Sequence, residues 1–308
     1  MPDIITVTFS PCIDKSTSVR FLAPDKKLRC AAPRLEPGGG GVNVARALKK
    51  LGTCATAIYP AGGYTGKYFI DLLDRESITS EIIETRNETR ENIIVLDEAT
   101  NQQYRFGMPG TGLEENEWQQ ILAVLQKMEG VRFIVASGSL PPGVPMDIFA
   151  RIAVIAKAKN AKLIVDTSGE ALKHALDEGV YLLKPSHAEL SFLAGKEFLE
   201  TSEINEAAKK IIDSGRCEAV VVSMGSAGAL LMTRMIERNF IPPHVKRMST
   251  VGAGDSMVAG MVFILAQGGS LETAVQYGVA SGTAATLNPG TELCRREDVE
   301  KLFQLMHT

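Results

Sequence analysis

The chain has 308 residues, of which 45% are hydrophobic and 22% are charged, the balance of a globular protein and not of a disordered one. Its formal net charge of −3 excludes the overall positive field that attracts nucleic acid or anionic membranes, so neither is expected as a partner. The length fits one large α/β unit, and we expect residues 1–308 to form a single domain.

The cysteines and the N-terminal segment indicate where the protein works. The five cysteines are odd in number, scattered and nowhere spaced as CxxC, which argues against a disulfide framework and against a zinc site. The opening "MPDIITVTFSP" lacks the basic and apolar regions of an export signal, and no run of about 18 apolar residues follows. We expect a cytoplasmic protein without a membrane span.

Strand and helix patterns alternate along most of the chain. Runs typical of strands lie at residues 4–9, 55–61, 132–138, 162–168, 180–185 and 218–224. Helical patterns lie between several of them, at residues 42–52, 68–77 and 116–130, and the first and last should close on Gly52 and Gly130. This alternation predicts a mostly parallel sheet with helices on both faces.

Two polar, turn-rich segments interrupt this alternation, at residues 15–36 and 88–107. The stretch "ENIIVLDEATNQQYRFGM" within the second predicts two strands joined by a polar turn. Strands outside a βα core suggest a small antiparallel lid that covers a site. A surface hairpin without a function is the alternative that composition leaves open.

The first glycine-rich segment is "PGGGGVNVARAL" at residues 37–48. Glycines let backbone amides approach a ligand, and the N-terminus of the following helix favours anions and hydroxyl oxygens. A dinucleotide fingerprint is rejected because Val44 stands at the third glycine position and Pro37 precedes the glycines. A P-loop is excluded because no GxxxxGK[ST] is present, and a flexible loop before a helix stays as the alternative.

The second glycine-rich segment is "STVGAGDSMV" at residues 249–258. The helix that follows is apolar nearly all round and should end at Gly268 and Gly269, which places Asp255 near the core. Asp255 could cap this helix, which stabilises a fold by about 1 kcal/mol. The flanking Gly252 and Gly254 instead suggest backbone amides aimed at a phosphoryl group, with Asp255 as the base for an acceptor hydroxyl.

Together, in this order and about 210 residues apart, the two segments resemble the signatures of the ribokinase-like (PfkB-type) carbohydrate kinases. The stretches "YRFGMPG", "SGSLPPGV", "DTSGEAL" and "GTAATLNPGT" extend the resemblance along the chain, most closely to the minor bacterial 6-phosphofructokinase branch. The resemblance implies a three-layer α/β/α sandwich with a small antiparallel β lid. It also implies transfer of the γ-phosphoryl group of ATP to O1 of fructose 6-phosphate.

The resemblance assigns Asp255 as the general base and Gly252, Ala253 and Gly254 as the anion hole. It also assigns sugar contacts, with a turn-forming role as the alternative for Asp14 and for Ser139. These contacts are Asp14, Gly39, Asn43 and Ser139.

Cations are needed to bind a phosphorylated sugar, and guanidinium groups suit this purpose best. The resemblance places Arg90 and Arg105 of the lid on the 6-phosphate, assisted by Lys27 and Arg29, with a neighbouring subunit as one source of the assistance. Without the resemblance, an exposed arginine on a hairpin is a solvated charge. Covering an exposed lid edge with its copy predicts a homodimer.

For the nucleotide, the resemblance assigns Lys184, Ser186, Ser223, Gly225 and Gly228 to ATP. Glu189 is expected to organise Mg²⁺ through water. The family pattern is Asn-x-x-Glu, and Ser186 stands where Asn is expected, so we predict weakened Mg²⁺ or ATP affinity. A loop that binds K⁺ in relatives matches residues Ser249, Val251, Ala285, Asn288 and Gly290.

Two other kinase activities and one function without catalysis remain open. The activities of 1-phosphofructokinase and tagatose-6-phosphate kinase use the same machinery, and Gly40 favours 6-phosphofructokinase because these rivals often carry Lys there. A sensor that binds sugar phosphate or nucleotide without catalysis is suggested by Ser186. The retained Asp255 and its glycines argue against that sensor.

Overall fold

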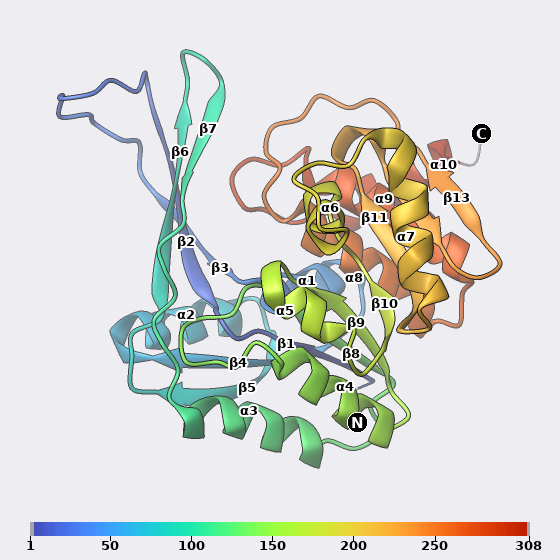
Figure 1. Cartoon of the computed structure of the whole chain (residues 1–308). Coiled ribbons are helices and arrows are strands. Elements are labelled where there is room, and N and C mark those ends of the chain that lie inside the picture. The colour runs from blue at the N-terminus through green and yellow to red at the C-terminus, as the bar shows by residue number, and fades with distance from the viewer. Residues whose placement is uncertain (1–2, 307–308) are drawn as a thin grey trace.

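The structure, a computed structural model, describes residues 3–306 and is built around one large twisted sheet (Figure 1). Within these residues the strand order is β13-β12-β11-β10-β9-β8-β1-β4-β5. β12 and β13 are antiparallel to their neighbours and the other pairings are parallel, as the alternating pattern predicts. The strands are β1 (Ile4–Val7), β4 (Thr56–Gly62), β5 (Thr79–Thr85), β8 (Phe133–Ser137), β9 (Lys162–Asp166), β10 (Val180–Leu183), β11 (Cys217–Ser223), β12 (Ala229–Met232) and β13 (Glu237–Phe240).

Helices cover both faces of this sheet, which gives the expected three layers (Figure 1). Alternate residues of each strand enter opposite cores: Val135 packs with one group of helices, while Ile134 and Ala136 pack with the other. The first group is α1 (Gly40–Leu51), α2 (Gly63–Arg75), α8 (Ala253–Ala266), α9 (Leu271–Ala285) and α10 (Arg296–Leu305). The second group is α3 (Glu115–Lys127), α4 (Ile148–Ala158), α5 (Gly169–Ala175), α6 (His187–Leu193) and α7 (Ile204–Asp213).

Two of the three predicted helix ends are confirmed and one differs. Helix α1 closes on Gly52, as predicted, because Gly52 adopts a left-handed conformation with φ 97°. Helix α3 ends at Lys127 rather than at Gly130, because Met128 is already extended. Helix α8 ends at Ala266 and closes on the expected glycines, because Gly268 has φ 81° and the amides of Gly268 and Gly269 bond the carbonyls of Leu265 and Ile264. No helix within residues 3–306 is long and apolar enough to cross a membrane.

The interrupting segments form a second sheet that projects from the body as a lid (Figure 1). Its order is β3-β2-β6-β7, with β2 (Cys12–Val19), β3 (Arg34–Gly38), β6 (Arg90–Asp97) and β7 (Gln102–Phe106). The β2–β3 and β6–β7 pairings are antiparallel, as expected, whereas the central β2–β6 pairing is parallel. The lid begins earlier than residue 15 because β2 starts at Cys12, so it includes Asp14.

Candidate active site

The glycine loop connects lid strand β3 to helix α1. Gly39, with φ 110°, precedes the helix, while Gly40 and Gly41 already belong to its first turn. A Cβ at Gly40 would lie 2.3 Å from the Ser137 hydroxyl oxygen and 2.6 Å from the Gly138 nitrogen. The helix N-terminus therefore packs directly on the end of β8, and a side chain at position 40 would push it away. The strand before the glycines belongs to the lid and not to the parallel sheet, so rejection of the dinucleotide fingerprint is confirmed.

Asp255 is the third residue of α8 and is not its N-cap. The N-cap is Gly252, with φ 72°, and no side chain makes the capping hydrogen bond. Instead, one carboxylate oxygen of Asp255 accepts a hydrogen bond of 2.9 Å from the amide nitrogen of Asn43. This bond joins the two glycine-rich segments across 212 positions of sequence. The capping interpretation of Asp255 is wrong, because the backbone amides of this helix end receive no side-chain oxygen.

The surroundings of Asp255 raise the pKa of its carboxyl group. Burial, followed by the nearby Asp166 carboxylate, raises its pKa from 3.8 to about 7, while Asn43 and Lys184 counteract the rise. A general base is most effective when its pKa lies near the working pH. Asp166 lies at the carboxyl end of β9 and was not singled out from the sequence, although its place at a strand end was a usable signal.

Asp14 lies within β2 and is held by its own strand and by the neighbouring one. One of its oxygens accepts hydrogen bonds from the Asn92 amide of β6 at 2.9 Å and from the Cys12 thiol at 3.3 Å. Burial and the adjacent Asp14 carboxylate raise the pKa of Cys12, so the thiol keeps its proton. Asp14 is therefore not a strand-end turn former. The sequence analysis missed Asn92 because cross-strand register cannot be read from one strand.

The arginines expected to bind phosphate lie on two neighbouring lid strands. Arg90 donates to the carbonyl oxygens of Ser10 and Met108 at 3.1 and 2.9 Å, while its Nε is buried without a hydrogen-bond partner within residues 3–306. A buried unpaired donor on a cation fits an anionic ligand. Arg105 donates to Gln103 and to the Thr250 hydroxyl at 2.5 Å.

The other residues expected to bind the sugar phosphate have exposed side chains. Ser139 is exposed just beyond β8. Lys27 and Arg29 are exposed in the loop between β2 and β3, which lies at the outer end of the lid (Figure 1). A single chain therefore does not bring these two cations to the body of the protein.

A cavity of about 510 Å³ lies on the other side of the α8 N-terminus. Three expected nucleotide residues line it: Ser223 and Gly225 after β11, and Gly228, where an added Cβ would lie 1.9 Å from the Phe240 carbonyl oxygen. The sequence analysis missed most of the remaining lining, from the loop before α8 and from α9. These residues include Ile241, Pro242, His244, Val245, Arg247, Val279, Gly282, Thr283 and Thr286.

A family model described as pfkB family carbohydrate kinase matches residues 7–298. The chain belongs to this pfkB family. It is 45% identical over 304 residues to ATP-dependent 6-phosphofructokinase isozyme 2 of Escherichia coli (strain K12), and the match covers 98% of each chain. Solved structures of the Escherichia coli phosphofructokinase-2 agree with it along its whole length.

Three of those structures bear on the site. The complex with potassium has a TM-score of 0.95 at 44% identity, and the complex with fructose-6-phosphate has 0.93 at 43%, each covering 100% of both chains. A tetrameric inhibited form has a TM-score of 0.94 at 44% identity, again over 100% of both chains. The homodimer expected from the sequence differs from the tetramer named for this relative.

The pfkB pattern Asn-x-x-Glu is replaced here by a helix cap. The Ser186 hydroxyl accepts from the Glu189 amide at 3.3 Å, and the Glu189 carboxylate accepts from the Ser186 amide at 2.7 Å. The preceding Lys184 is buried and forms an ion pair of 3.1 Å with Asp166. Burial lowers the pKa of Lys184, but Asp166 and Glu189 outweigh it and the net effect raises the pKa. A charged Lys184 beside Gly254 suits an anion at the helix end.

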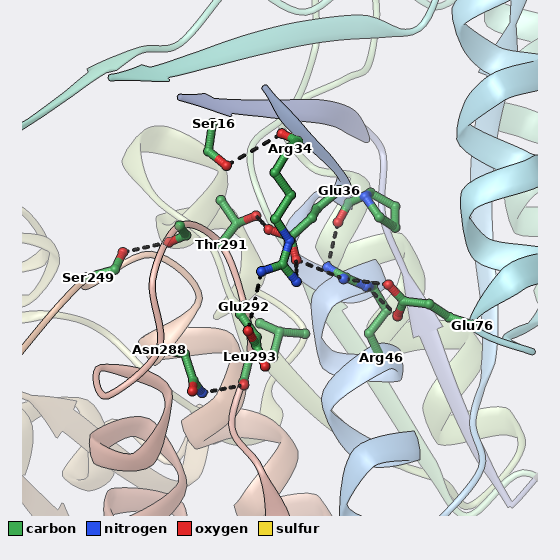
Figure 2. Close-up of polar contacts among 12 residues, drawn as sticks. Ser16, Arg34, Glu36, Arg46, Glu76, Ser249, Asn288, Thr291, Glu292 and Leu293 are labelled. Carbon is green, nitrogen blue, oxygen red and sulfur yellow. Dashed lines mark hydrogen bonds and ion pairs between the residues drawn. The ribbon is translucent and has the colours of Figure 1, made fainter. Parts of the chain in front are cut away.

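The segments matched to the potassium loop of pfkB relatives lie together (Figure 2). The Ser249 hydroxyl donates to the Gly290 carbonyl at 2.6 Å and accepts from the Val251 amide at 3.2 Å. The backbone amide of Asn288 donates to the Ala285 carbonyl. The side-chain amide of Asn288 donates to the Leu293 carbonyl at 3.0 Å. Within residues 3–306 no three His, Cys, Asp or Glu side chains cluster as metal ligands. The atoms available here to coordinate an ion are carbonyl oxygens, which suit K⁺.

Both edges of the lid contact these segments. On the β3 edge, Glu36 accepts a hydrogen bond of 2.7 Å from Thr291, and Arg34 pairs with Glu292 at 3.4 Å (Figure 2). On the β7 edge, Gln103 and Arg105 bond the hydroxyls of Ser249 and Thr250. The lid is therefore attached on one side to the loop between α9 and α10 and on the other to the loop before α8.

Proposed function

We propose that the chain is an ATP-dependent 6-phosphofructokinase that transfers the γ-phosphoryl group to O1 of fructose 6-phosphate. The hydrogen bond between Asn43 and Asp255 carries this proposal, because it brings a candidate sugar contact and a candidate base to one point beside a glycine-rich helix end. Membership of the pfkB family and the 45% identity to a 6-phosphofructokinase support the substrate.

In the proposed reaction, Asp255 accepts the proton of the sugar O1 hydroxyl as that oxygen attacks the γ-phosphorus. The amides of Gly252, Ala253 and Gly254 stabilise the charge on the phosphoryl oxygens, since they lie at a helix N-terminus. The sugar hydroxyls are held by Asp14, Gly39, Asn43 and Ser139, so the acceptor oxygen is oriented before the transfer.

The 6-phosphate binds Arg90 and Arg105 in this proposal, and the unpaired Nε of Arg90 supplies one donor. Lys27 and Arg29 reach the site from a neighbouring subunit through a contact between lids. Large exposed apolar side chains on the lid support that contact: Phe21, Ile93, Tyr104, Phe106 and Met108. A lid variant such as Phe106→Glu should weaken assembly in light scattering, and an unchanged mass at micromolar concentration would contradict the contact.

ATP occupies the cavity beside α9 with its phosphates at Lys184 and the α8 N-terminus. Glu189 would hold Mg²⁺, and the Ser249 and Gly290 segments would hold K⁺. When bound, these ions would neutralise phosphate charge. These ions, like the cytoplasmic location, are proposals, supported for K⁺ by the potassium complex of the Escherichia coli relative.

The test is an assay of the purified protein with ATP, Mg²⁺ and a panel of hexose phosphates. We expect ADP release with fructose 6-phosphate at the highest kcat/KM, abolished by Asp255→Ala. Preference for fructose 1-phosphate or tagatose 6-phosphate would replace the substrate, and binding without ADP release would indicate the sensor. The capping role of Ser186 removes the observation that suggested a sensor, because it gives this residue a structural function.

A further inference from the structure

Arg46 is a fully buried cation one helical turn after Asn43, and only 2% of it is exposed. Its guanidinium forms a two-point ion pair with Glu76 at 2.6 and 2.8 Å, at the end of α2. It also donates at 2.6 Å to the carbonyl of Pro37, in the lid strand β3. Figure 2 shows Arg46 beside Glu76 and Glu36. Arg46 is therefore fixed by three elements at the base of the lid.

The same guanidinium also touches the site. The nitrogen that bonds Pro37 donates to the side-chain oxygen of Asn43 at 3.3 Å. The other end of the Asn43 amide donates to Asp255 at 2.9 Å. A guanidinium only donates and a carboxylate only accepts, so an amide between them satisfies both in one orientation alone. The order Arg46, Asn43, Asp255 thus fixes which end of the amide faces the carboxylate.

We propose that Arg46 is a positioning residue for the general base, holding the Asn43 amide so that it donates to Asp255. This proposal rests on the role of Asp255 proposed above. Stability alone is a weak explanation for Arg46, because a buried ion pair is often matched or exceeded in stability by packed apolar side chains. An apolar residue at position 46 would leave the Asn43 amide free to turn.

The charged and polar groups around Asp255 make its pKa sensitive to the hydrogen bond from Asn43. Asp14 of β2 and Asp166 of β9 disfavour its charged form, while Asn43 of α1 and Lys184 after β10 favour it. Because Asn43 is one of the groups that favour the charged form, weakening its bond shifts Asp255 toward its protonated form. A protonated Asp255 cannot accept the hydroxyl proton, so the loss appears as a change in pH dependence rather than in binding alone.

The test compares Arg46→Lys with Arg34→Lys. Arg46→Lys keeps the charge but loses the planar fork, whereas Arg34→Lys alters a neighbouring partner of Glu36 that makes no contact with Asn43. We expect Arg46→Lys to raise the titration midpoint of Asp255 by about half to one pH unit, about half of what complete loss of a hydrogen bond to a charged group implies, because the Asn43 bond is weakened and not removed. Arg34→Lys should leave it unchanged.

The midpoint is read by NMR of the ligand-free protein with ¹³C-labelled aspartate, with Asp255→Asn used for assignment. This measurement needs no turnover, so it separates failure of the inference from failure of the proposed activity. If the enzyme is active, the acidic limb of kcat/KM should move by the same amount. A folded Arg46→Lys protein with an unmoved Asp255 midpoint overturns the proposal.

Two further variants keep the test decisive if Arg46→Lys does not fold. Glu76→Gln weakens the anchor of the guanidinium and should give a smaller shift in the same direction, and no shift in a folded protein counts against the proposal. In an Asn43→Ala background, Glu76→Gln or Arg46→Lys should add nothing to the shift, since the intermediate amide is gone. An equal shift in that background would show that Arg46 acts on Asp255 by another route.

Discussion

The proposed sugar side and the proposed nucleotide side of the site are built differently. On the sugar side, hydrogen bonds within the protein already hold the polar side chains. Asn92 donates to Asp14, and Asn43 accepts from Arg46 and donates to Asp255. On the nucleotide side, a cavity of about 510 Å³ is lined by apolar residues, by serine and threonine residues, and by exposed His244 and Arg247. A fixed polar group favours the transition state of one reaction, whereas a shaped cavity mainly favours binding. Substitutions should therefore act on rate on the first side and on affinity on the second.

Asp255→Asn should give the largest effect. The amide keeps the shape but cannot accept the proton, so kcat should fall by about 10² to 10⁴-fold. The KM for ATP should change little, because neither Asn43 nor Asp255 lines the proposed nucleotide cavity. Steady-state kinetics measures both constants, and a kcat within tenfold of the wild type would remove Asp255 as the base.

Arg90→Lys should give the next largest effect. Lysine loses the planar set of donors that reaches Ser10, Met108 and the ligand, so the KM for fructose 6-phosphate should rise by about 10 to 100-fold. Arg86→Lys is the matched control, because Arg86 is exposed and pairs only weakly with Glu114 at 3.5 Å. Equal kinetics for the two variants would contradict a phosphate role for Arg90.

Stability should depend on pH through Asp255. Its pKa is about 7 in the folded protein and near 3.8 when unfolded, so ionisation destabilises the fold. As pH rises from about 4 through about 7, the Tm of the wild type should fall relative to that of Asp255→Asn and then level off. Calorimetry across this range measures the difference, and a constant difference would mean that Asp255 is not perturbed.

Ser186→Asn should give the smallest effect, on the nucleotide side. Asn restores the amide of the family pattern, and we expect the KM for MgATP to fall by about two to fivefold. Asn is as good an N-cap as Ser, so the Tm should stay the same. Ser186→Ala is the control, because it removes the cap of α6 and should lower the Tm. A Ser186→Asn enzyme with unchanged KM would show that the departure from the pattern has no consequence for ATP.

The elements and the two glycine-rich segments could be predicted because their signals are local. The parallel sheet follows from alternating strand and helix patterns, and the lid from polar strands outside that alternation. The partners of the site residues could not be predicted in the same way. Asn92 reaches Asp14 through strand register, and Arg46 is linked to Asp255 only because its helical neighbour Asn43 bonds a residue 212 positions away, so neither link leaves a local pattern.

Much of the lining of the proposed nucleotide cavity was missed for a related reason. The loop around Pro242 and Val245 has no periodicity, and α9 faces the cavity with residues that also suit a core helix. In a sequence, apolar residues that line a cavity look the same as apolar residues of an ordinary core. Two glycines beside an acidic residue do not.

The attachment of the lid on two sides limits how it can open. Because β3 bonds Thr291 and Glu292 while β7 bonds Ser249 and Thr250, a swing about either edge strains the opposite one. Opening of the lid about one edge therefore breaks the contacts of the other, and lifting the lid away as a whole breaks both sets.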